Sequence, residues 1–189
     1  MSTRELIEGC LHNDTTAQRH FYVNYSPRIM GICMRYASGV KDTELMAAYV
    51  FKNLYKELVK CPNDIEMDQW IDERAIWNAI AYLHQDKQRY FIAKTTRYME
   101  NKNSTGEPVD EAVLNTEESR KIYLAALHAL TPSYRILYNL TYVDGMTPDK
   151  IIENLEIARE TYKAELEQAR FQFKQHLNTY LHENGLRKQ

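Results

Sequence analysis

The sequence predicts an all-α protein made of two small helical domains joined by a flexible linker. Only 6 glycines and 5 prolines interrupt its 189 residues, a composition that favours helices over turn-rich β-structure. Apolar residues recur three and four positions apart, and no run alternates apolar and polar residues over the length of a strand. One polar segment divides this pattern in two. We therefore predict domains over residues 1–100 and 119–189, with a linker over residues 101–118.

The composition narrows the classes of function. A net charge of −2 gives no indication of a nucleic-acid partner. No apolar run approaches the ~20 residues that a membrane helix needs. Neither histidine spacing nor a glycine-rich phosphate loop indicates a metal or nucleotide site. We expect no catalytic residue, cofactor, metal, membrane association or small-molecule substrate. Three widely spaced cysteines indicate reduced thiols of a cytoplasmic protein: Cys10, Cys33 and Cys61.

The linker is predicted where the chain is poorest in apolar residues. Gly106 and Pro108 break any helix there. Residues 101–119 carry one basic and five acidic groups, whereas residues 1–100 balance 13 basic with 13 acidic groups. Residues 120–189 carry 10 basic and 8 acidic groups. The linker is therefore expected to be acidic as well as flexible.

The first domain is expected to begin with two helices. Residues 6–11 form an apolar stripe at helical spacing, and the helix ends near residues 12–13. Asp14 or Thr15 can cap the second helix, which extends to the Ser-Gly pair after Ala37. A proline at position 27 is expected to kink or interrupt it.

Two further helices complete the first domain. The third is predicted from about Asp42 to the Cys-Pro-Asn sequence that starts at Cys61, and the fourth begins near Glu66 and continues past Leu83. The residues of the third helix expected to face inward are Leu45, Ala48, Phe51, Leu54, Tyr55 and Leu58.

The second domain is predicted to open with a helix over residues 122–130. Thr131-Pro132 then supplies a cap and a first-turn proline for a helix that stops at Asp144-Gly145. Thr147-Pro148 opens a short third helix. A tight connection leads through Ile157 into a long amphipathic helix, a helix-turn-helix pattern. The polar tail from Asn178 is expected to fray.

Several short motifs are distributed over both halves of the chain. The first half contains Leu6-Ile7-Glu8-Gly9-Cys10-Leu11, Ala17-Gln18, Tyr25-Ser26-Pro27-Arg28, Met30 through Ala37, and Trp70-Ile71 through Leu83. The second half contains Leu130-Thr131-Pro132, Tyr134-Arg135, Gly145, Ile151, Leu155-Glu156-Ile157, Thr161, Lys163, Leu166 and Ala169-Arg170. Together these motifs resemble the extracytoplasmic-function (ECF) class of bacterial sigma factors, in the small two-domain type found in Bacteroidetes.

The resemblance implies a role in transcription initiation. It implies that a region 2-like domain binds the clamp helices of core RNA polymerase and captures unstacked bases of the −10 promoter element. It implies that a region 4-like helix-turn-helix domain contacts the −35 element in the major groove. The implied partners are core RNA polymerase, promoter DNA and an anti-sigma or targeting protein.

The helix that the resemblance assigns to polymerase binding departs from the family. Asp42 and Glu44 match its acidic positions, but Ala48 and Tyr49 replace a Gln-Glu pair that makes charge-assisted hydrogen bonds. Phe51 and Tyr55, four positions apart, also fit a place in the core. The candidate polymerase-binding residues are Asp42, Glu44, Tyr49, Phe51, Lys52 and Tyr55.

The helix that the resemblance assigns to promoter opening carries two tryptophans on one face. Trp70 fits the core, whereas an exposed Trp77 can stack on an unpaired base. Asp72 and Glu73 stand where basic residues are frequent in the family, and they repel phosphate. The candidate contacts to DNA are Arg74, Trp77, Asn78, His84, Lys87 and Arg89.

The expected recognition helix mixes donors with acidic residues. Between Asp144 and His176, five basic residues are outnumbered by seven acidic ones. Because phosphate neutralisation dominates the affinity for duplex DNA, we expect weak binding without help. The candidate DNA contacts on this helix are Arg159, Thr161, Tyr162, Lys163 and Arg170.

The turn before that helix departs from the family as well. Glu156 replaces the turn glycine, and Ala158 replaces the usual serine cap. A non-glycine residue at positive φ is strained, so we expect Glu156 in an ordinary helical conformation.

Two hypotheses from different classes follow. The leading one is a sigma factor with weakened autonomous DNA recognition, which needs a targeting partner. The alternative is a degenerate sigma-derived interaction module that regulates transcription without binding DNA itself. An unrelated helical DNA-binding repressor would account for the second domain but not for the first.

Overall fold

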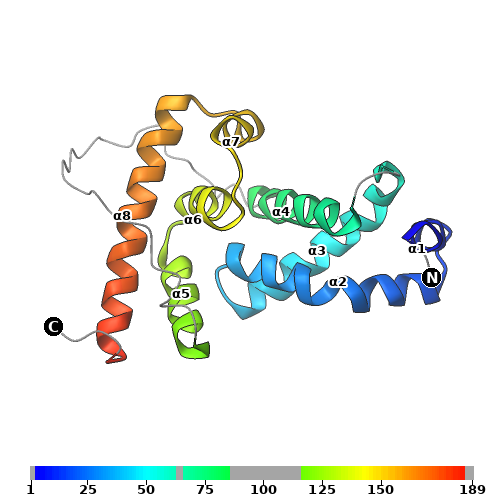
Figure 1. Ribbon diagram of the computed structural model, residues 1–189, viewed down its shortest axis with the longest axis horizontal. Helices are drawn as coiled ribbons and strands as arrows, with labels where there is room; N and C mark the ends of the chain where they lie inside the picture. Colours follow the sequence, from blue (N-terminus) through cyan, green and yellow to red (C-terminus); the bar gives the residue numbers. More distant parts are fainter. Residues whose placement is uncertain (1–2, 63–65, 86–115, 186–189) are drawn as a thin grey trace. The chain divides into compact units, whose positions relative to one another are not determined.

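The computed structural model describes residues 3–62, 66–85 and 116–185 (Figure 1). Within these ranges every regular element is a helix, which confirms the all-α prediction. The chain divides into two compact units, Met1–Arg89 and Tyr90–Gln189.

The predicted linker lies almost wholly outside the described residues. Of its last three positions, Thr116 caps a helix and residues 117–118 form its first turn. The Thr116 hydroxyl accepts a hydrogen bond from the Ser119 amide at 3.1 Å, and the Ser119 hydroxyl accepts one from the Thr116 amide at 3.2 Å. This reciprocal pair is a capping box, so the helix that starts at Glu117 begins inside the segment predicted as linker.

In the first unit, helix α1 (Thr3–Leu11) is followed by the long helix α2 (Thr15–Tyr36). The Asp14 carboxylate accepts hydrogen bonds from the amides of Thr16 at 2.7 Å and Ala17 at 3.3 Å, which confirms the predicted cap. Helix α2 continues through Pro27, so the predicted interruption is wrong. Pro27 and Val23 both lie on the exposed side of the helix, where water can replace the missing amide donor.

Helix α3 (Val40–Glu57), the short 3₁₀ helix η1 (Leu58–Lys60) and helix α4 (Met67–Gln85) complete the first unit. Leu45 was expected to face inward but is 62% exposed, and Ala48 is exposed as well. The inward stripe is rotated by about one position from the predicted one, because α2 and α4 cover a different side of α3. The buried residues of α3 are Thr43, Met46, Ala47, Val50, Phe51 and Leu54.

The second unit contains α5 (Glu117–Ala129), α6 (Pro132–Tyr138), α7 (Pro148–Leu155) and α8 (Arg159–Glu183), with a π-helical turn, η3 (Asn139–Val143), after α6. The predicted starts at Thr131-Pro132 and Thr147-Pro148 are confirmed. The Thr147 hydroxyl accepts a hydrogen bond from the Lys150 amide at 3.4 Å.

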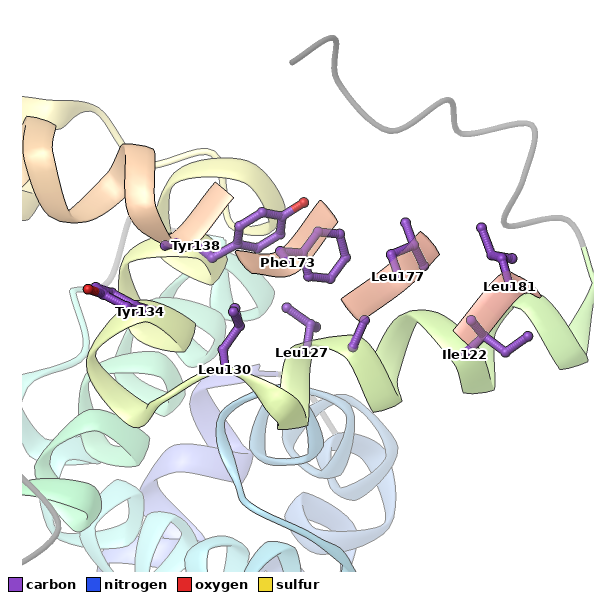
Figure 2. Close-up of a cluster of buried hydrophobic side chains, with 10 residues drawn as sticks. Ile122, Leu127, Leu130, Tyr134, Tyr138, Phe173, Leu177 and Leu181 are labelled. Atoms are coloured by element: carbon purple, nitrogen blue, oxygen red, sulfur yellow. The ribbon is translucent and has the colours of Figure 1, made fainter. Parts of the chain in front are cut away.

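The core of the second unit forms where α8 packs along α5 and α6. Figure 2 shows the side chains of α5 facing those of α8 across this interface. Helix α8 continues to Glu183 because Leu181 is only 6% exposed and packs into the core, so the predicted fraying is wrong for residues 178–183. The last four residues of the predicted tail, 186–189, lie outside the described residues. The core residues are Ile122, Ala126, Leu127, Leu130, Tyr134, Tyr138, Ala169, Phe173, Leu177 and Leu181.

Phe173 lies at the centre of this core. Its side chain is 1% exposed, and its ring centroid lies 4.3 Å from that of Tyr138 and 5.0 Å from that of Tyr123. Burial raises the pKa of Tyr138 above its usual range, so the ring beside Phe173 stays neutral. Phe173 therefore joins α8 to both α5 and α6 (Figure 2).

Replacing Phe173 with alanine is expected to lower the free energy of unfolding of the second unit by about 3–5 kcal/mol. Urea denaturation followed by circular dichroism measures the loss. Both tryptophans, Trp70 and Trp77, lie in the first unit, so tryptophan fluorescence follows that unit alone. Phe173→Leu is the control and is expected to cost far less. A loss below about 1 kcal/mol for Phe173→Ala would contradict the central role of this ring.

Candidate nucleic-acid and protein interfaces

Asp42, a candidate polymerase contact, is engaged inside the first unit. One carboxylate oxygen accepts hydrogen bonds from the amide and the hydroxyl of Ser38, both at 2.8 Å. The other accepts one from the hydroxyl of Tyr82 at 3.2 Å. Gly39, which precedes α3, has no side chain to cap the helix. The Asp42 carboxylate therefore closes the α2–α3 turn and joins it to α4.

Two of the aromatic candidates on α3, Phe51 and Tyr55, are held against α2. Phe51 is 8% exposed, and its ring lies 4.9 Å from Tyr22 and 6.4 Å from Phe21. The Tyr55 hydroxyl donates to the Gln18 carbonyl at 3.1 Å, and burial raises the pKa of Tyr55. Phe51 therefore takes the core position that was the alternative for it, and Tyr55 is half-buried against α2.

The outer face of α3 is formed by other residues. Glu44 and Lys52 are exposed, and Ala48 lies between them at four-residue spacing. Leu45, 62% exposed, adds an apolar side chain to this surface, which we call the α3 face (Glu44, Leu45, Ala48 and Lys52). Leu45 was not predicted as an interface residue because its apolar side chain also fits an inward-facing stripe. Tyr49 borders the face, half-buried, with its ring 5.7 Å from Tyr82.

On α4, three candidates share one exposed side. Arg74 and His84 are exposed and Trp77 is half-buried between them, at helical spacing. Partial burial lowers the pKa of His84, so its ring is neutral at pH 7. Trp70 is 5% exposed and belongs to the core, as expected. The remaining two candidates, Lys87 and Arg89, lie outside the described residues.

Asn78 differs from these three. It is 8% exposed, and its amide nitrogen donates to the Glu57 carboxylate, 3.3 Å from the nearer oxygen, and to the Arg74 carbonyl at 2.9 Å. The side chain fastens α4 to α3. This engagement argues against the base contact that we predicted for Asn78, because its donors are already used within the unit.

The acidic residues near the start of α4 have a partner on α2. The Arg28 guanidinium lies 3.3 Å from the Asp68 carboxylate and 3.1 Å from that of Asp72. These three side chains are between 40% and 60% exposed, so the pairs contribute modestly to stability. Their main effect is that one positive charge offsets part of the negative charge of Asp68 and Asp72.

In the second unit, α7 and α8 are joined by only three residues, 156–158. Glu156 has φ 53° and ψ 41°, so the expected helical conformation is wrong. The tight connection requires a left-handed residue, since the amides of Glu156 and Ile157 turn back to the carbonyls of Glu153 at 3.3 Å and Ile152 at 3.2 Å. Ala158 precedes α8 without a side-chain cap, as predicted.

The donors on α8 divide between the surface and the core. Arg159 and Lys163 are exposed, and Arg170 is partly exposed. Lys163 lies four positions after Arg159 and Arg170 lies eleven positions after it, so all three share one face of the helix. Thr161 is half-buried. Tyr162 is 4% exposed and its hydroxyl is 3.2 Å from that of Thr141, which argues against a DNA contact.

Two features of this region were not predicted from the sequence. Arg159 forms an ion pair with Asp149 on α7, ten positions earlier, which becomes visible only once the turn geometry is known. Glu165 lies near Tyr134, whose pKa is raised mainly by burial and further by this carboxylate. Glu160 and Glu167 are exposed, so acidic groups flank the basic face of α8.

Neither a metal centre nor a membrane span is found in the parts of the chain that the structure describes. No three His, Cys, Asp or Glu side chains gather there as metal ligands. No helix among those residues is both long and apolar enough to cross a bilayer. Cys10 and Cys33 are buried free thiols, and burial raises the pKa of Cys33 to about 12, so it stays protonated at neutral pH.

Comparison with known proteins identifies the fold. No protein-family model and no curated protein matches the chain. Among solved structures it is similar to the sigma factor RpoE from Bartonella quintana, determined in complex with the anti-sigma factor NepR. The TM-score is 0.50 at 13% sequence identity, and the match covers 85% of this chain and 96% of that one. The chain therefore has a sigma-factor-like, all-α fold.

Replacing Glu156 with glycine is expected to stabilise the second unit by about 0.5–1 kcal/mol, because glycine adopts the left-handed conformation without strain. Chemical denaturation measures the change. Glu156→Ala removes the same charge but keeps the strain, so it is the matched control. Equal stabilisation by both variants would attribute the effect to charge rather than to the backbone.

Proposed function

We propose that this protein is a divergent ECF-type sigma factor, Bacteroidetes-like, which binds core RNA polymerase and promoter DNA in the cytoplasm. The observation that carries the proposal is the extent of the fold likeness. It covers 85% of this chain and 96% of a sigma factor, more than either unit alone could supply. The sequence motifs of the same class also occur in both halves. We assign residues 1–100 to a region 2-like domain and residues 119–189 to a region 4-like domain, whose first described helix starts at its cap Thr116. The acidic linker between them is then residues 101–115.

The α3 face is the proposed polymerase-binding surface. It combines an exposed apolar side chain, Leu45, with charged groups at its ends, Glu44 and Lys52. Apolar contact flanked by charge is the usual composition of a protein interface. Because the Asp42 carboxylate is engaged internally, this surface has to rely on fewer charged contacts than the family pattern offers.

Two helix faces, one on α4 and one on α8, are the proposed DNA contacts. On α4 these are Arg74, Trp77 and His84, where an aromatic ring can stack on an unpaired base. On α8 they are Arg159, Thr161, Lys163 and Arg170. Acidic neighbours limit the gain from phosphate contacts, so promoter recognition is proposed to need polymerase or a separate targeting protein.

The alternative function is an interaction module that does not bind DNA. One observation favours it: the solved sigma factor of similar fold is in complex with an anti-sigma factor, so this fold also serves protein–protein recognition. An anti-sigma or similar regulator is therefore a further proposed partner. The two functions differ in whether polymerase is retained.

Tagged wild-type protein is expected to retain core RNA polymerase from its own host, and Lys52→Glu is expected to reduce the retained polymerase about tenfold. A charge-assisted contact contributes about 1.5–3 kcal/mol, enough for a loss of that size. Co-purification followed by mass spectrometry measures it. Arg19→Glu, an equal charge reversal on an exposed position of α2, is the control and should retain polymerase. If another protein is retained without polymerase, the interaction module is correct.

The free protein is expected to bind duplex DNA weakly, with a dissociation constant of about 1–100 μM at physiological salt, the range of non-specific binding. Fluorescence anisotropy with labelled promoter DNA measures it. Nanomolar binding of the free protein to a promoter would contradict the proposed need for a targeting partner.

A further inference from the structure

The first basic residue of α8, Arg159, forms an ion pair with a residue of α7. Arg159 is the first residue of that helix, and its guanidinium contacts the carboxylate of Asp149 in the first turn of α7. The same two groups form a hydrogen bond from Arg159 Nη2 to Asp149 Oδ1. The contact spans the three-residue turn that contains Glu156.

The position of each charge accounts for the pairing. The amino-terminal end of a helix carries a partial positive charge, which favours Asp149 at the start of α7 and disfavours Arg159 at the start of α8. The Asp149 carboxylate relieves the unfavourable placement of Arg159. A guanidinium binds carboxylate and phosphate through the same planar donor geometry, so the group that Arg159 would offer to DNA already has an acceptor.

The pair is also accessible to a competing anion. The side chain of Arg159 is 54% exposed and that of Asp149 is 78% exposed. Exposed ion pairs are weak, since water and salt screen them. A DNA phosphate can therefore displace the carboxylate, but only after the internal contact is broken.

We propose that Asp149 restrains the DNA affinity of α8 by binding Arg159 as an internal substitute for a DNA phosphate. The inference rests on the proposed function of α8 as a DNA contact and adds a residue that sets its strength. Asp149 competes directly with a DNA phosphate for the Arg159 guanidinium. The weak binding of the free protein to DNA then results from a specific contact between α7 and α8 rather than from net charge alone.

Asp149→Asn is expected to raise the affinity of the full-length protein for a fluorescein-labelled duplex of mixed sequence about threefold to tenfold at ~50 mM salt. The slope of log affinity against log salt should steepen by about one, because one more phosphate is neutralised. Anisotropy titrations at ~50 and ~200 mM salt measure both quantities. Asp149→Ser is the second variant, in case the asparagine protein is poorly folded by circular dichroism.

Two controls isolate the ion pair. Glu153→Gln removes one negative charge from the same helix, four residues further along, and should change the affinity less than about twofold. In the double variant Asp149→Asn with Arg159→Gln, the gain should vanish and the affinity should equal that of Arg159→Gln alone.

The outcomes separate this inference from the proposed function. Equal gains from Asp149→Asn and Glu153→Gln, or a gain that persists without Arg159, would overturn the role of the pair while α8 remained a DNA contact. If neither the wild type nor any variant binds duplex DNA at ~50 mM salt, DNA binding by α8 is wrong and this inference fails with it.

Discussion

Burial of one face of each long helix is the constraint on which the rest of this structure depends. In the second unit, Phe173, Leu177 and Leu181 must face α5 and α6, and this rotation of α8 leaves Arg159 and Lys163 at the surface. In the first unit, Val50 and Leu54 do the same for α3 and direct Lys52 outward. The surfaces available to a partner are therefore formed by the residues that the cores leave exposed. Which residues these are depends on how each helix is rotated about its axis.

This constraint explains which parts of the structure could be predicted from sequence. Helix ends depend on local chemistry, so the Asp14 cap, the start at Thr147-Pro148 and the stop at Asp144-Gly145 were all predicted correctly. The rotation of α3 was not, because its apolar residues allow two inward stripes. One stripe includes Leu45 and the other includes Met46, and only packing against α2 and α4 selects between them.

The sequence predicted which residue types could form the interfaces more reliably than it predicted which of those side chains are free to bind a partner. Asp42, Asn78 and Tyr162 have side chains suited to binding, yet each is bonded to a residue 21 to 40 positions away, namely Tyr82, Glu57 and Thr141. Such contacts depend on two helices at once and leave no local signal in the sequence. The αL conformation of Glu156 was missed for a related reason. The need to join α7 and α8 through three residues outweighs the preference of a glutamate for ordinary helical angles.

The electrostatic effect of a charged residue depends on the ion pairs it forms as well as on the net charge of the region. Asp72 adds a negative charge at a position expected to approach DNA, but the Arg28 guanidinium, which also pairs with Asp68, offsets part of it. Arg159 adds a positive charge at the start of α8, but Asp149 balances that in turn. Net charge therefore overstates the repulsion at α4 and the attraction at α8. Since both pairs are exposed, neither contributes much to stability, and their effect falls mainly on the field that an approaching phosphate meets.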